Sequence, residues 1–347
     1  MVNIEIIDKL NKNKTLDECE WGKLISDYTK EDYEYSSSIA REIAKEKFSN
    51  KLYLRGIVEF SNICKNDCLY CGIRRSNNNV HRYRLTKDEI LECCNLGYEL
   101  GYRTFVFQGG EDAYFTDEIL CDIIKTVKEK FSDCAITMSV GERSLESYKK
   151  MYNAGADRYL LRHETADCSH YQKLHPENMR LETRLQCLKN LKEIGFQTGC
   201  GMMIGSPYQT AKELSCDMKF ISEFKPHMIG MGPFISHKDT PFKNEENGSV
   251  YLTLFLLSLC RIMLPNVLLP ATTALGTLDK EGQKKGVLSG CNVVMPNLSP
   301  STVRKKYMLY DNKIGSDFDA FQSLEFFKHQ IEEIGYEIVN IRGDYKE

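Results

Sequence analysis

Residues 52–72 read LYLRGIVEFSNICKNDCLYCG. The first part, Leu52–Phe60, is dominated by apolar, β-branched and aromatic residues, which predicts a strand. Cys64, Cys68 and Cys71 follow in a C-x3-C-x2-C pattern. Three thiolates at this spacing can hold three irons of a [4Fe–4S] cube and leave the fourth iron open, whereas cubes are usually held by four cysteines. The stretch therefore predicts a strand that leads into an iron–sulfur site with one free coordination position.

Two other kinds of cysteine site fit the pattern less well. Structural zinc usually takes four ligands in two pairs, and the adjacent Cys93 and Cys94 make a poor second pair. A redox C-x-x-C pair of Cys68 and Cys71 leaves Cys64 unexplained. The spacing instead resembles that of the radical S-adenosylmethionine (SAM) enzymes, in which the open iron chelates the amino and carboxylate groups of SAM. We therefore favour the cluster over zinc or a redox pair.

The composition indicates a globular protein of a reducing compartment. The chain has 347 residues, 42% of them hydrophobic and 27% charged. The net charge of −3 provides no basic surface for nucleic acid. Charged residues interrupt the first ten positions, so we expect no signal peptide, and the run Tyr251–Leu264 predicts a buried helix because it is too short to cross a bilayer. Fourteen cysteines favour a reducing, cytoplasmic location. We also expect no membrane partner.

The pattern of elements predicts an α/β fold. Residues 1–50 are expected to form an N-terminal helical extension, with helix starts at Thr15 and at Thr29, which has Asp32 three residues later. Residues 51–347 are expected to form a single domain that ends in a helical tail. The expected strands are Leu52–Phe60, Thr104–Phe107, Ala135–Val140, Arg158–Arg162, Gln197–Ile204, Met228–Gly232, Val267–Ala271 and Cys291–Met295.

Eight strands that alternate with helices over about 250 residues predict a complete (β/α)8 TIM-type barrel. A doubly wound open sheet is the alternative, but no G-x-G-x-x-G follows the first strand. Active sites of such barrels lie at the carboxyl ends of the strands. Residues that could bind SAM occur there. Gly109, Gly110 and Glu111 could lie near the amino group and Glu164 at the ribose. Arg162 and Arg184 could bind the carboxylate, and Met203 could lie beside the adenine.

The fourth expected strand carries unusual charge. Arg158, Arg162 and Glu164 share one face of the strand by parity. Inward-facing charge is costly unless it is paired or used. We interpret this face, with Thr272 and Thr273 at the same level, as part of a cavity for an anionic ligand; an internal layer of ion pairs is the alternative.

Several runs at the strand ends resemble the HydE-type maturases of [FeFe]-hydrogenase, and the resemblance extends from the first strand to the eighth. These runs are the cysteine triad, Gln108–Asp112, Arg162–Thr165, Gly232–Ile235, Pro270–Ala274 and Met295–Asn297. The resemblance implies cluster ligation by Cys64, Cys68 and Cys71. It places Ser139, Glu164 and Arg184 at SAM, together with Tyr70, which immediately precedes Cys71. It also implies a substrate cavity lined by Gln108, Arg158, Arg162, Thr272, Thr273 and Tyr307.

The same resemblance implies an activity and partners. The adenosyl radical is expected to act on sulfur in an iron–cysteine carbonyl/cyanide precursor that a partner maturase makes, and the product is expected to pass to a scaffold GTPase. Reduced ferredoxin or flavodoxin is the expected electron donor. Some members bind a second cluster after the last strand, but here Cys291 is the last cysteine. We therefore expect a single [4Fe–4S] cluster, which binds SAM.

Three alternatives remain open. A methylornithine synthase-like lysine mutase would use the same barrel and triad. A biotin synthase-like enzyme is disfavoured, because its fifth-strand cysteine would fall at Gly199, with Cys200 on the opposite face. A metal-binding module without enzymatic activity is the alternative of another class.

Overall fold

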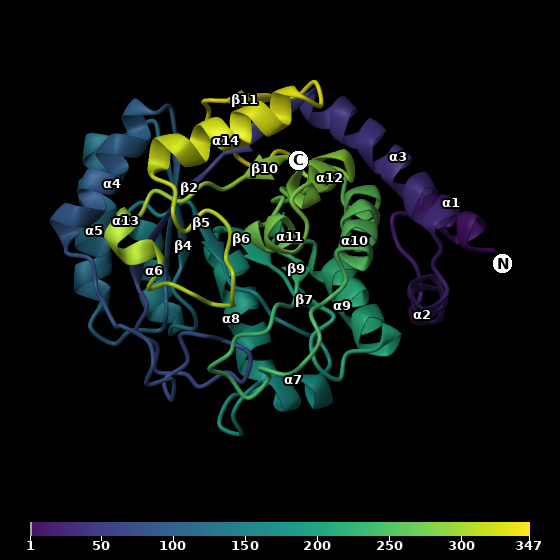
Figure 1. Cartoon of the computed structure of the whole chain (residues 1–347), viewed down its shortest axis with the longest axis horizontal. Helices are drawn as coiled ribbons and strands as arrows, with labels where there is room; N and C mark the ends of the chain where they lie inside the picture. The colour runs from purple at the N-terminus through teal and green to yellow at the C-terminus, as the bar shows by residue number, and fades with distance from the viewer. Residues whose placement is uncertain (1) are drawn as a thin grey trace.

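The structure is a computed structural model that describes residues 2–347. Its strands pair in parallel and form a ring that helices surround (Figure 1). The strands are β1 (Lys51–Leu54), β2 (Gly56–Ser61), β3 (Thr104–Gly109), β4 (Ala135–Ser139), β5 (Arg158–Leu160), β6 (Gln197–Cys200), β7 (Met203–Ile204), β8 (Met228–Ile229), β9 (Gly232–Pro233), β10 (Val293–Val294) and β11 (Glu337–Val339).

The strand order closes the barrel. β2, β3, β4, β5, β6 and β8 pair in that order, and β1, which runs directly into β2, pairs with β10. The circle is completed by the single bridges Met228–Leu268, Pro270–Val293 and Ile57–Asn297. The chain therefore forms the complete (β/α)8 barrel that the alternation of strands and helices predicts.

The seventh position of the barrel differs from the predicted strand Val267–Ala271. Only isolated bridges occur there, because Pro270 has no N–H to donate to a ladder. The Leu268 carbonyl accepts from the Ile229 N–H at 3.1 Å, and the Ala271 N–H donates to the Val293 carbonyl at 3.0 Å. Separate backbone hydrogen bonds on the two sides therefore close the ring at this position.

Helices precede, surround and follow the strands. Three lie before β1: α1 (Asn3–Asn13), α2 (Glu18–Ser26) and α3 (Lys30–Phe48). The others are α4 (Lys87–Glu99), α5 (Asp117–Lys130), α6 (Leu145–Asn153), α7 (Cys168–Leu174), α8 (Leu181–Ile194), α9 (Ala211–Phe224), α10 (Val250–Met263), α11 (Thr273–Leu278), α12 (Gly282–Leu288), α13 (Ser301–Arg304) and α14 (Ala320–Glu332).

The starts of the first helices follow local capping chemistry. Thr29 caps α3 by accepting from the Asp32 N–H at 3.2 Å, as predicted. The predicted helix start at Thr15 is wrong. The Asp17 carboxylate caps α2 instead, by accepting from the Glu20 N–H at 2.9 Å. Asp is among the best capping residues, and Glu20 completes the reciprocal box.

The predicted buried helix is α10, almost all of whose side chains are inaccessible. It packs between α3 and the barrel, and the hydroxyl oxygens of Ser36 on α3 and Ser258 on α10 lie 2.7 Å apart. Figure 1 shows α3 alongside α10 at the outside of the ring. Among residues 2–347, no helix combines the length and apolarity needed to cross a bilayer.

Candidate active site

The carboxyl ends of the strands surround one cavity of about 340 Å³. The strand register brings Glu59, Gln108 and Ser139 side by side at its wall, since Glu59 pairs with Gln108 and Gln108 pairs with Ser139. Sixteen residues predicted to form the site line this cavity. They are Cys64, Cys68, Tyr70, Cys71, Gln108, Gly109, Gly110, Glu111, Ser139, Arg162, Glu164, Arg184, Met203, Thr272, Thr273 and Tyr307.

A register shift between Glu59 and Ser61, at the end of β2, precedes the cysteine loop. The loop is tied by a two-point ion pair, with Arg74 Nε 2.9 Å and Nη2 2.7 Å from the Asp67 carboxylate oxygens. Burial alone would raise the pKa of Asp67, but the hydrogen bonds from Arg74 and Ser76 lower that pKa to about 2. Asp67 is therefore ionised at neutral pH and holds the loop shape.

Gly110 allows the second strand end to approach the cysteines closely. A β-carbon at Gly110 would lie 2.8 Å from Cys64 Cβ, a distance that real side chains do not tolerate. The next N–H, of Glu111, points to Cys64 Sγ at 3.4 Å. The Gly110 backbone therefore lies against the cysteine loop, and the predicted approach of Gly109, Gly110 and Glu111 to the amino group of SAM stays a prediction.

The three thiols suit a [4Fe–4S] cluster. All three line the same cavity, and cysteine thiolates are the usual ligands of [4Fe–4S] clusters. Nowhere in residues 2–347 do three His, Cys, Asp or Glu side chains form a group able to hold one metal ion; in a cube each thiolate binds its own iron. Burial raises the pKa of each thiol, that of Cys71 to about 12, so cluster binding must displace their protons.

Two charged pairs lie at the cavity wall and contribute Arg162, Glu164 and Arg184 to its lining. Arg162 Nη2 lies 2.9 Å from Glu164 Oε2, and Arg184 Nε lies 2.5 Å from Glu142 Oε1. Arg184 also donates from Nη1 to the Arg162 carbonyl at 2.7 Å, which joins the pairs. Burial would lower the pKa of Arg184, but Tyr171 and Glu142 raise it well above its usual value. Arg184 therefore stays cationic inside the cavity wall.

Several polar atoms of this wall have free hydrogen-bonding capacity. Arg162 Nε and Thr272 Oγ1 are buried and have no hydrogen-bond partner in the described part of the chain. Glu164 adopts a left-handed backbone with φ of 67°, which is uncommon for a residue with a side chain. Unsatisfied buried groups and strained backbone are costly, and such costs concentrate at functional sites.

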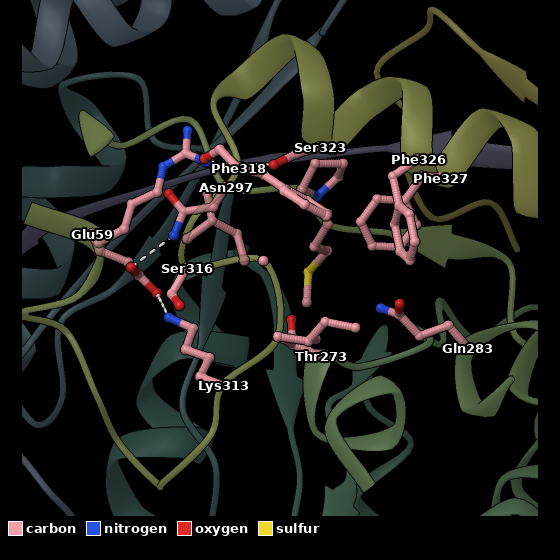
Figure 2. A pocket seen from close by; sticks show the side chains of 16 residues that line it. Glu59, Thr273, Gln283, Asn297, Lys313, Ser316, Phe318, Ser323, Phe326 and Phe327 are labelled. Carbon is pink, nitrogen blue, oxygen red and sulfur yellow. Dashed lines mark hydrogen bonds and ion pairs between the residues drawn. The ribbon is translucent and has the colours of Figure 1, made fainter. Parts of the chain in front are cut away.

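Sequence reasoning missed a buried ion pair at the cavity wall. Lys313 pairs with Glu59, and Asn297 Nδ2 donates to Glu59 Oε2 at 2.7 Å (Figure 2). A second cavity of about 50 Å³ adjoins the pair and shares Thr273 and Met295 with the main cavity. Glu59 could have indicated such a pair, because a single acidic side chain within an apolar strand needs a partner. Nothing in the sequence indicated Lys313 as the partner, since it lies in an irregular segment.

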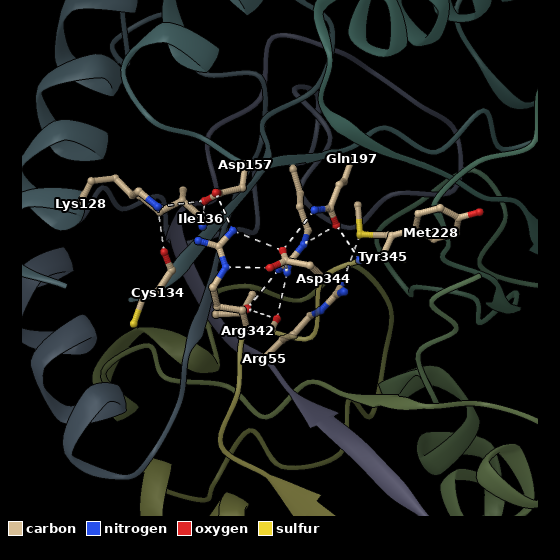
Figure 3. A network of polar contacts seen from close by, with 12 residues as sticks. Arg55, Lys128, Cys134, Ile136, Asp157, Gln197, Met228, Arg342, Asp344 and Tyr345 are labelled. Atoms are coloured by element: carbon tan, nitrogen blue, oxygen red, sulfur yellow. Dashed lines mark hydrogen bonds and ion pairs between the residues drawn. The ribbon is translucent and has the colours of Figure 1, made fainter. Parts of the chain in front are cut away.

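Arg158 does not belong to the substrate cavity, and that prediction is wrong. It lies at the opposite end of the barrel, where its guanidinium donates to Thr104 Oγ1 at 3.0 Å, the Arg342 carbonyl at 2.9 Å and Asp344 Oδ1 at 2.5 Å. Figure 3 shows Arg342 and Asp344, which follow β11, in polar contact with Asp157 and Gln197 at this end of the barrel. Arg158 and Arg162 share a face but lie four residues apart, about 13 Å along a strand. For Arg158 the alternative, an internal layer of ion pairs, is correct.

Comparison with known proteins agrees with this geometry. The model of the Radical SAM superfamily matches residues 58–221. The [FeFe] hydrogenase maturase subunit HydE of Thermotoga maritima is 46% identical over 276 residues, which cover 80% of this chain and 78% of that protein. This chain belongs to the HydE family.

More distant relatives share the barrel with this HydE-family protein. The 3-methylornithine synthase of Methanosarcina barkeri is 26% identical over 309 residues, covering 88% of this chain and 87% of that protein. A crystal structure of methylornithine synthase superposes with a TM-score of 0.83 over 96% of this chain and 97% of the other, at 24% identity. That likeness shows a common fold.

Proposed function

We propose that this protein is a radical SAM enzyme that acts in the maturation of [FeFe]-hydrogenase. The observation that carries the proposal is the convergence of the cysteine triad, Arg162, Glu164 and Arg184 on one cavity. Its support from outside the structure is the 46% identity to a hydrogenase maturase. Cys64, Cys68 and Cys71 would hold the cluster, which together with bound SAM would supply the reductive cleavage of a carbon–sulfur bond that is typical of radical SAM enzymes.

Different residues bind the cluster and the different parts of SAM. Cys64, Cys68 and Cys71 hold a single [4Fe–4S] cluster. Glu164 accepts from the ribose hydroxyls, and Arg184, kept cationic by Glu142, offers a guanidinium fork to the SAM carboxylate. The remaining SAM contacts are Tyr70, Gly109, Gly110, Glu111, Ser139 and Met203.

The substrate is a small anionic species that contains sulfur, of the iron–cysteine precursor type. Arg162 Nε and Thr272 Oγ1 are buried donors without a partner in residues 2–347, which suits an anionic ligand. Thr273, Gln108 and Tyr307 complete the lining, and Gln108 Nε2 donates to the Tyr307 hydroxyl at 3.3 Å.

The proposed role implies protein partners. A precursor-making radical SAM maturase supplies the substrate, a scaffold GTPase receives the product, and reduced ferredoxin or flavodoxin supplies the electron. A reducing cytoplasm suits the fourteen cysteines of this chain.

Anaerobic reconstitution with iron and sulfide, followed by dithionite and SAM, tests the radical chemistry. We expect a cube spectrum and 5′-deoxyadenosine from the wild type and neither from Cys68→Ala, with Cys121→Ala on α5 as the matched cysteine control. Zinc in place of the cube would support the metal-binding module. Restored hydrogenase activity in a maturase-deficient host tests the role, and lysine consumption without such restoration would favour the mutase.

A further inference from the structure

The tyrosine of the cysteine motif, Tyr70, makes a hydrogen bond to a buried histidine, His175. Tyr70 lies between Cys68 and Cys71 and lines the cavity, and its hydroxyl oxygen lies 3.2 Å from His175 Nε2. His175, the residue that follows α7, is only 2% exposed. The two rings meet edge to face, with centroids 5.4 Å apart.

The surroundings of His175 fix the direction of this hydrogen bond. His175 Nδ1 lies 2.9 Å from the Tyr171 carbonyl oxygen, which can only accept, so Nδ1 carries the proton. Burial lowers the pKa of His175 to about 3, so the ring is neutral and Nε2 has a free lone pair. The Tyr70 hydroxyl must therefore donate to Nε2. Stacking on the Tyr171 ring, with centroids 3.9 Å apart, fixes the plane of the imidazole.

The segment around α7 supports the rest of the cysteine loop as well. The Leu69 N–H donates to the Leu174 carbonyl at 2.9 Å, one residue before the histidine. Leu69 and Tyr70 pack on a small cluster that contains Leu174, while Cys68 packs on a second cluster that contains Tyr171. The loop therefore rests on α7 through backbone, ring and hydroxyl contacts together.

We propose that His175 is a positioning residue for the SAM site, which holds Tyr70 and thereby the Cys68–Cys71 segment in the geometry that SAM requires. The inference rests on the proposed function, because Tyr70 is assigned to SAM there. Its physical basis is preorganisation: a loop that is fixed before binding loses less freedom when SAM arrives.

Four single variants of the reconstituted holoprotein and the double variant His175→Phe/Tyr70→Phe test the proposal. His175→Phe keeps a buried ring but removes the acceptor, and Tyr70→Phe removes the donor. His175→Gln keeps an acceptor oxygen. His227→Phe is the control, since His227 accepts from the Thr198 N–H at 2.9 Å at the far end of the barrel. The readouts are the SAM dissociation constant and the change in the electron paramagnetic resonance spectrum of the reduced cluster when SAM is added.

We expect His175→Phe and Tyr70→Phe each to weaken SAM binding about three- to tenfold, the range for one neutral hydrogen bond. The double variant should bind SAM at most about twofold more weakly than either single variant, because His175→Phe and Tyr70→Phe remove the same hydrogen bond. His175→Gln should recover part of the affinity, and His227→Phe should bind SAM like the wild type.

The outcomes separate this inference from the proposed function. A wild type whose spectrum does not respond to SAM refutes the proposed function. A wild type that responds, with His175→Phe of equal affinity and an equal spectral change, overturns only the role of His175, as do fully additive losses in the double variant. If His175→Phe does not fold, Tyr70→Phe decides the matter alone, because it removes the same bond from the other side.

Discussion

The network at the amino-terminal end of the barrel allows a quantitative stability prediction for Asp344→Asn. Asp344 accepts from Arg158 Nη2 at 2.5 Å, Arg342 Nε at 2.8 Å and Gln197 Nε2 at 3.1 Å. The substitution keeps the side-chain shape but removes the carboxylate charge, which leaves the fully buried Arg158 without it. Removal of one partner from a buried pair is strongly destabilising, because the remaining charge stays desolvated.

The magnitude follows from the titration of Asp344. Burial would raise its pKa, but Arg342 and Arg158 lower it from 3.8 to about 2. At about 1.4 kcal/mol per pKa unit, and with a small reduction for solvent because the side chain is 29% exposed, the charge contributes about 2 kcal/mol. With an unfolding entropy of about 2.1 cal/mol/K per residue over 347 residues, this loss lowers Tm by about 3 °C.

The pH dependence has a definite sign. The pKa of Asp344 is lower in the folded state than in the unfolded chain, so its contribution is complete above about pH 5 and is lost as the pH falls through about 2. Anaerobic thermal melts of wild type and Asp344→Asn should differ at neutral pH and converge in acid. Asp317→Asn is the matched control, because its ion pair with Lys305 is exposed and should have little effect. Equal Tm values at neutral pH, or a difference that persists unchanged at low pH, would refute the reasoning.

Three further predictions concern the cavity. Arg162→Met should slow 5′-deoxyadenosine formation about tenfold or more, because it removes the hydrogen bonds that the charged Arg162 guanidinium would make to the ligand; an unchanged rate measured by chromatography would contradict this. Lys313→Met should lower the free energy of unfolding by about 3 kcal/mol, since it leaves Glu59 buried without a cation, and Glu59→Gln in the same chain should restore much of the loss in anaerobic denaturation. Iron and sulfide analysis after full reconstitution should give about four of each per chain, and a count near eight would show a second cluster.

Much of the site could be predicted because parallel strands bring their carboxyl ends to one rim. Once the strands were located, residues far apart in the chain, such as Cys64, Glu164 and Thr272, were expected to meet, and they line one cavity. This inference needs only the strand positions and their common direction. It does not depend on side-chain detail, and so it tolerates errors in strand boundaries, such as the seventh position at Pro270.

What could not be predicted depends on irregular segments. Lys313 reaches Glu59 from a stretch between α13 and α14 that has no periodic pattern. His175 reaches Tyr70 only because the chain leaves α7 in an extended conformation at that residue. Such contacts are set by the path of the backbone after an element ends, and one sequence carries little information about that path.

The two arginines of the fourth barrel strand show why depth must be considered with parity. Arg158 is the first residue of β5, and Arg162 lies two residues after β5 ends at Leu160. At the amino-terminal end Arg158 has protein partners for its guanidinium, including the Asp344 carboxylate, so its charge contributes to stability there. At the carboxyl end Arg162 keeps a buried Nε that no group in residues 2–347 accepts from. A fold gains nothing from leaving such a donor unsatisfied, whereas a ligand can bind to it. The difference in hydrogen-bond satisfaction between Arg158 and Arg162 therefore agrees with the cysteines in placing the functional end of the barrel at the carboxyl ends of the strands.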